Sequence, residues 1–139
     1  MKSIAVNENL SISDQIEATD IERLAQEGIE AILCNRPDEE EADQPSFSDI
    51  AAAAEAKDIE AVYIPFKTAE MKPEHVAEMR RLQGSGKRLH AFCRSGNRSF
   101  CLYAAAQASR GLPKEQILQQ AEKAGVAVEK IIESYYEDA

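Results

Sequence analysis

The sequence contains no tryptophan, few histidines and cysteines, and no long apolar run among its 139 residues. A bilayer-spanning helix needs about 20 consecutive apolar residues, and no stretch of this chain approaches that length. The N-terminal residues also lack the apolar core of a secretory signal. We therefore expect a cytoplasmic protein without a membrane partner.

The cysteines and histidines are too few and too scattered for a disulfide framework or a zinc site. Cys34, Cys93 and Cys101 are odd in number and form no C-x-x-C pair. His75 and His90 form no H-x-x-x-H pattern and do not cluster with the cysteines. We expect neither a metal nor another cofactor.

Acidic residues outnumber basic ones by 25 to 16, which gives a formal charge of -9. Much of the acid lies in residues 38–41 and near the C-terminus. Such a surface repels nucleic acid and anionic membranes, so a nucleic-acid partner is not expected. The basic residues near Cys93 form a local exception.

Strand-like and helix-like segments alternate along the chain, a pattern typical of a parallel sheet covered on both faces. We predict a single α/β domain over residues 1–139, with a mainly parallel sheet of four or five strands flanked by helices. The expected strands are residues 3–11 (one or two strands), 29–33, 60–65 and 88–92. The expected helices are residues 19–26 (capped by Thr19 or Asp20), 46–57, 73–82, 97–110, 113–124 and 128–136.

Cys93 lies at the end of a predicted parallel strand and is followed by the loop Arg-Ser-Gly-Asn-Arg98 and a predicted helix. Ligands of open α/β sheets bind at this edge, where loop amides and a helix N-terminus stabilise an anion or a thiolate. Gly96 permits a tight turn, and Arg98 can hold an oxyanion with two parallel hydrogen bonds. The other expected anion-binding residues of this segment are Arg94, Ser95, Asn97 and Ser99.

A thiolate at Cys93 is compatible with two reactions. Attack on phosphorus gives a cysteinyl phosphate, which water then removes. Attack on a sulfane sulfur gives a persulfide. The same loop would stabilise either product, so the residues leave both reactions open.

The segment Cys93-Arg-Ser-Gly-Asn-Arg98-Ser99 resembles the signature loop of cysteine-dependent, dual-specificity-like phosphatases. Cys34-Asn-Arg-Pro-Asp38, Gln44-Pro45 and Ile64-Pro65 are similar to other recurrent segments of the bacterial phosphatase-like domain of beta-lactamase hydrolase-like proteins. The resemblance spans nearly the whole chain. It implies a cysteine phosphatase-like fold and hydrolysis of a phosphate monoester, either a small molecule or a phosphoprotein.

The loop departs from the usual phosphatase pattern in two ways. Phe92 stands where a histidine is usual, and four residues instead of five separate Cys93 from Arg98. The shorter loop is similar to that of rhodanese-type sulfurtransferases. Two alternatives therefore stay open: a sulfurtransferase with a persulfide on Cys93, or a noncatalytic anion-binding or redox-sensing module in which Cys34 pairs with Cys93.

Three residues outside the loop are candidate helpers. By its position after the third core strand, Glu70 resembles the family's general acid, although a solvated glutamate is equally compatible with the sequence. Asn35 and Arg36 follow another predicted strand at the same edge and could bind the substrate anion. Arg36 could instead pair with Asp38 or Glu39.

Overall fold

The computed structural model describes residues 1–67 and 70–136. Its sheet has five strands in the order β1-β2-β5-β3-β4. The strands are β1 (Ser3–Asn7), β2 (Leu10–Ser13), β3 (Ala31–Cys34), β4 (Glu60–Tyr63) and β5 (Leu89–Phe92). The helices are α1 (Asp20–Gln26), α2 (Phe47–Glu55), α3 (Pro73–Gly84), α4 (Asn97–Ser109), α5 (Lys114–Ala124) and α6 (Glu129–Ile132).

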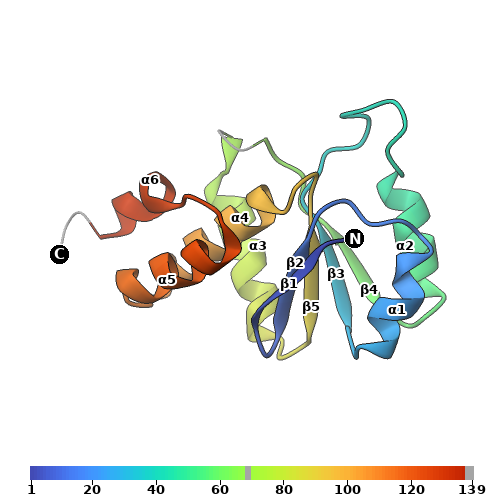
Figure 1. The fold of residues 1–139 in the computed structure, drawn as a ribbon, viewed down its shortest axis with the longest axis horizontal. Helices are drawn as coiled ribbons and strands as arrows, with labels where there is room; N and C mark the ends of the chain where they lie inside the picture. Colours follow the sequence, from blue (N-terminus) through green and yellow to red (C-terminus); the bar gives the residue numbers. More distant parts are fainter. Residues whose placement is uncertain (68–69, 137–139) are drawn as a thin grey trace.

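The sheet is parallel except at one edge. β2, β5, β3 and β4 pair in parallel, whereas β1 forms an antiparallel hairpin with β2. The predicted α/β class, the mainly parallel sheet and the helices on both faces are confirmed (Figure 1).

Successive residues of a strand point to opposite faces, and this alternation produces two hydrophobic cores. Leu33 and Ala91 belong to the larger core, which includes residues of α3, α4, α5 and α6. Ile32 and Phe92 belong to the smaller core, with residues of α1 and α2. Figure 1 shows α1 and α2 on one side of the sheet and α3 to α6 on the other.

Helix α4 is buried almost all round and connects the sheet to the C-terminal helices. Every residue from Arg98 to Ala106 is buried, and the alanine-rich sequence lets neighbouring elements approach closely. The helix begins directly after the Cys93 loop, because Gly96 turns the backbone at a φ of 97°. The packing of α4 therefore fixes the position of its N-terminus next to the loop.

Two local expectations are wrong. Thr19 has helical backbone angles and makes no side-chain capping hydrogen bond; instead the Glu17 amide donates to the Asp20 carboxylate. The expected helix over residues 128–136 is α-helical only over Glu129–Ile132 and then tightens into a 3-10 turn, Glu133–Tyr135. Tertiary contacts fix this short end, because Ile132 is fully buried and the Tyr136 hydroxyl donates to the Leu112 carbonyl.

In the part of the chain that the structure describes, each helix is too short or too polar to cross a bilayer.

Candidate functional site

The site lies where β3 and β5 end side by side. Cys34 is the register partner of Phe92, and the Asn35 amide donates to the Phe92 carbonyl at 2.9 Å. Cys93 therefore follows β5 directly beside the residue that follows β3. Parallel strands bring their carboxyl ends to one edge, so two sequence-distant loops meet here (Figure 1).

Cys93 is fully buried and lies under the N-terminus of α4. The Gly96 amide donates to the Cys93 sulfur at an N–Sγ distance of 3.0 Å. The positive end of a helix also attracts anions, so the same amides can contribute to binding a negatively charged group beside the sulfur. A Cβ added at Gly96 would lie 3.4 Å from the Ile12 side chain, so residue 96 has little room for a larger residue.

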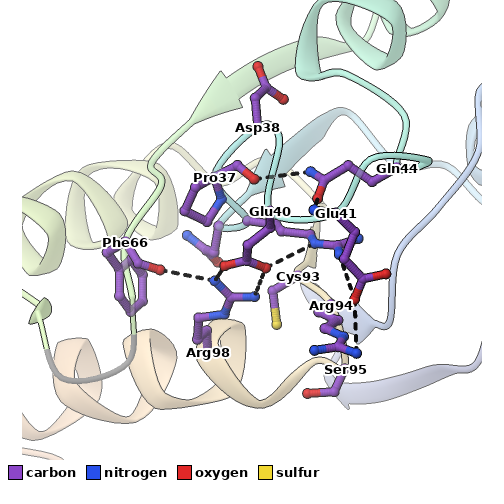
Figure 2. Close-up of polar contacts among 12 residues, drawn as sticks. Pro37, Asp38, Glu40, Glu41, Gln44, Phe66, Cys93, Arg94, Ser95 and Arg98 are labelled. Carbon is purple, nitrogen blue, oxygen red and sulfur yellow. Dashed lines mark hydrogen bonds and ion pairs between the residues drawn. The ribbon is translucent and has the colours of Figure 1, made fainter.

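Arg98 lies on the first turn of α4 and is almost fully buried. Its terminal nitrogens donate to both carboxylate oxygens of Glu40, Nη1 at 2.6 Å and Nη2 at 2.8 Å. Nη1 also donates to the Phe66 carbonyl at 3.3 Å. Glu40, and after it the neighbouring Cys93, raise the pKa of Arg98 above its ordinary value. The expected bidentate contact therefore exists, with a carboxylate of the chain itself (Figure 2).

Glu40 is shared by two arginines. Arg36 donates its Nε to Glu40 at 3.1 Å, and its Nη1 donates to the Gln15 side chain at 3.0 Å. Hydrogen bonds from Arg98 first, and then from Arg36, lower the pKa of Glu40 to about 2, although desolvation acts in the opposite direction. Arg36 thus pairs with Glu40, and with Glu41 at 3.5 Å, instead of with Asp38 or Glu39.

The rim of the loop is also neutralised by the acidic run. Arg94 is largely exposed and forms an ion pair with Glu41 at 2.9 Å. The acidic run therefore lies against the basic residues near Cys93 and offsets part of their charge. The Gln15 amide donates to the Arg94 carbonyl at 3.4 Å, which ties the loop to the segment after β2.

The remaining predicted loop and rim residues have mainly local contacts. Ser95 is exposed, and its hydroxyl accepts a hydrogen bond from the Asn97 amide at 3.3 Å. Asn35 is buried and donates its side-chain amide to the Ile64 carbonyl at 3.0 Å, which braces β3 against the segment after β4. Among the described residues, the buried Ser99 hydroxyl has no hydrogen-bond partner.

Glu70 lies at the surface on the connection between β4 and α3. Its amide donates to the Lys67 carbonyl at 2.7 Å, and its carboxylate makes no hydrogen bond or ion pair within residues 1–67 and 70–136. Phe66, four residues earlier, contacts Arg98 through its carbonyl, so the same connection passes the site. The role of Glu70 as general acid stays a prediction.

All three cysteines are free thiols, and two have surroundings that favour the neutral form. Burial raises the pKa of Cys34 to about 12 and that of Cys101 to about 11. The Cys34 thiol donates to the Arg36 carbonyl at 3.4 Å. Within the described ranges, no group of three or more His, Cys, Asp or Glu side chains is arranged to hold a metal.

The sequence interpretation missed three contributors to the site: Gln15, Glu40 and Glu41. The acidic run had a detectable signal, because it follows a predicted strand whose carboxyl end meets the arginine-flanked loop. Gln15 had none, because a glutamine in a connecting segment is common. Its position becomes informative only once β2 is known to pair with β5.

The geometry is that of a phosphatase-like α/β protein, with a cysteine and an arginine on one loop at the carboxyl edge of a parallel sheet. A solved structure of a candidate phosphatase from Neisseria meningitidis Z2491 is similar over 98% of this chain and 97% of its own, with a TM-score of 0.82 and 33% identity. The active form of the protein Tk-PTP matches 98% of this chain and 94% of its own at 20% identity and a TM-score of 0.72, which shows the fold.

The sequence model of the family described as "Beta-lactamase hydrolase-like protein, phosphatase-like domain" matches residues 3–110. The chain belongs to this family. A beta-lactamase hydrolase-like protein of Agrobacterium fabrum is 29% identical over 112 residues, which cover 80% of this chain and 26% of that protein. The chain thus spans about a quarter of that relative's length.

Proposed function

We propose that this chain is a cysteine-dependent phosphatase-like hydrolase acting on phosphate monoesters. The observation that supports this most directly is the placement of Cys93, with the Gly96 amide on its sulfur and Arg98 beside it. A thiolate and a fixed guanidinium at a helix N-terminus are the groups that phosphoryl transfer through cysteine requires. The family and the fold are consistent with this chemistry.

In the proposed reaction the Cys93 thiolate attacks phosphorus, and the bond from phosphorus to the ester oxygen breaks. The leaving oxygen takes a proton from Glu70 or from water. Water then attacks the cysteinyl phosphate, which releases inorganic phosphate and restores the thiolate. Arg98 and the amides of the loop, with Arg94, Ser95, Asn97 and Ser99 around them, stabilise the negative charge in both steps. The substrate is a phosphorylated small molecule or a phosphoprotein.

The test compares the purified wild-type chain, Cys93→Ser and the control Cys101→Ser on an aryl phosphate under reducing conditions. We expect phosphate release by the wild type and by Cys101→Ser but not by Cys93→Ser. The same three proteins are assayed with thiosulfate and cyanide. Phosphate release without the thiol would exclude Cys93 as the nucleophile, and Cys93-dependent thiocyanate without phosphate release would assign sulfur transfer instead.

A further inference from the structure

Arg98 is held from one side and free on the other. An arginine has five N–H donors, which form two edges that each can hold an oxyanion with two bonds. Three donors are engaged: Nη1 with Glu40 and Phe66, and Nη2 with Glu40. In the described part of the chain, the Nε–H and the second Nη2–H have no oxygen or nitrogen acceptor, and the remaining side-chain partner of the guanidinium is the Cys93 sulfur. These two groups lie on the same edge of the planar guanidinium.

The free edge faces the cysteine. Figure 2 shows the Cys93 side chain on the side of the Arg98 guanidinium away from Phe66. Cys93 is also among the causes that raise the pKa of Arg98, so the two groups are close. An anion bound by the free edge would therefore lie next to the Cys93 sulfur.

Glu40 is itself fixed in place. Its Oε1 accepts from Arg98 and also from Arg36, which is buried and anchored to Gln15. The pKa of Glu40 is lowered to about 2, so its carboxylate is charged at neutral pH and can accept both hydrogen bonds. Because it carries no proton at neutral pH, Glu40 cannot protonate a leaving group at that pH.

We propose that Glu40 is a positioning residue, which fixes the guanidinium of Arg98 so that its Nε and Nη2 edge receives the anion at Cys93. This inference rests on the proposed function, in which that anion is the phosphoryl group of the substrate. Holding the guanidinium before the substrate arrives removes the cost of ordering a long, flexible side chain during binding and reaction. Phe66 adds a second restraint through its backbone carbonyl, which no substitution of its side chain removes.

The first experiment measures the affinity for inorganic phosphate by calorimetry at pH 7.5. Glu40→Gln keeps the size of the side chain but replaces one acceptor oxygen by a donor, and we expect phosphate binding to weaken about tenfold. Glu39→Gln removes the same charge from the neighbouring residue, which forms no ion pair among the described residues, and should stay within about twofold. Removing a negative charge alone would strengthen phosphate binding. A loss of phosphate affinity in Glu40→Gln therefore distinguishes positioning from a change in charge.

A double-mutant cycle shows whether Glu40 acts through Arg98. In an Arg98→Lys background no guanidinium remains to be oriented, so Glu40→Gln should change phosphate affinity less than about twofold. Equal losses in both backgrounds would mean that Glu40 only supports the loop, and would overturn the proposal. Glu40→Asp serves as a second variant, because it keeps the charge but is too short for the same contact; wild-type affinity of Glu40→Asp would also overturn it.

The outcomes separate this inference from the proposed function. If the cycle behaves as expected but no variant releases phosphate from an aryl phosphate, Glu40 still positions an anion receptor and the hydrolase assignment falls. If release depends on Cys93 but Glu40→Gln binds phosphate as well as or better than the wild type, the hydrolase assignment stands and the positioning role falls. Tighter binding would mean that Glu40 competes with anions for Arg98.

Discussion

The ends of β3 and β5 lie next to each other, and each places a cysteine at the same edge of the sheet. Cys34 is the last residue of β3, and Cys93 follows directly after β5. Cys34 donates its thiol hydrogen to the Arg36 carbonyl, whereas Cys93 accepts a hydrogen bond from the Gly96 amide. The sulfur of Cys34 is thus a hydrogen-bond donor, and the sulfur of Cys93 is a hydrogen-bond acceptor.

The difference comes from the chain that follows each strand. After β5, α4 begins at Asn97, so its N-terminal amides are close to Cys93. After β3, the acidic segment over residues 35–46 separates Cys34 from the start of α2, and the Cys34 thiol donates to the Arg36 carbonyl within that segment. The proposed nucleophile Cys93 is thus the cysteine whose strand is followed closely by a helix. The segment after β3 contributes to the site in another way, because it places Arg36 and Glu40 next to Arg98.

The strongest test of this comparison replaces each of the two cysteines by serine in a separate variant. Cys93→Ser should lower kcat/KM for an aryl phosphate by at least about 1,000-fold, because an alcohol at neutral pH is a poor nucleophile. Cys34→Ser should change it by less than about threefold, because Cys34, with a pKa of about 12, stays a neutral thiol. Steady-state kinetics under reducing conditions measure both. Equal losses in the two variants would contradict the assignment of different roles.

A smaller effect is expected from the arginines of the two loops. Arg98→Lys should lower kcat/KM about 100-fold, or about 2.7 kcal/mol, because an ammonium group cannot replace the planar fork at the reacting phosphate. Arg36→Lys should cost about fivefold, since Arg36 acts through Glu40. The same kinetic assay compares them, and a larger loss for Arg36→Lys would reverse the proposed order.

The two strands also differ at a register pair, where His90 of β5 lies beside Ile32 of β3. The ring nitrogens of His90 lie 2.7 Å from the Ser11 hydroxyl and 2.8 Å from the Ser13 hydroxyl. Burial lowers the pKa of His90 to about 4. Between pH 6.5 and 4, His90 therefore binds a proton in the unfolded chain but stays neutral in the folded protein.

The stability of the folded protein should therefore fall as the pH drops below 6.5. Between pH 6.5 and pH 5 the free energy of unfolding should decrease by about 2 kcal/mol from this group. Urea denaturation at several pH values measures the decrease. His90→Gln lacks the ionisable group and should lose this part of the slope; an unchanged slope in that variant would assign it to other groups.

The smallest effect concerns the turn that distinguishes the β5 end. Gly96→Ala should destabilise the protein by about 1–2 kcal/mol, because the φ of 97° is strained for any residue with a Cβ. Gly84→Ala is the matched control at the end of α3, where a Cβ meets no atom within 4 Å. Its stability should change by less than about 1 kcal/mol, and in the favourable direction. Thermal unfolding followed by circular dichroism compares the two variants.

Most of the fold could be predicted from local patterns. The apolar runs of β3, β4 and β5, Pro73 at the first turn of α3 and Ser46 as the N-cap of α2 each have a local physical cause. The end of the chain was harder to predict, because a helix pattern over residues 128–136 does not reveal where buried anchors shorten the helix. The extent of the domain over residues 1–139 stays a prediction.

The candidate site was only half predictable. Cys93, Gly96 and Arg98 lie within six consecutive residues, so their proximity is visible in the sequence. The acidic run was recognised as a charged loop, but its partners were misassigned, because charge alone does not say which arginine a glutamate reaches. Hydrogen bonds over 58 residues of separation, such as the contact between Glu40 and Arg98, depend on the order of the strands in the sheet.

The sequence by itself determined the alternation of strands and helices, the family resemblance and the position of the cysteine loop. These properties follow from local periodicity and from residues that are neighbours in the chain. Only the tertiary structure decided which cysteine accepts a hydrogen bond from the start of a helix, and which carboxylate holds Arg98. Both depend on the parallel pairing of β3 with β5, which brings together two loops that the sequence separates.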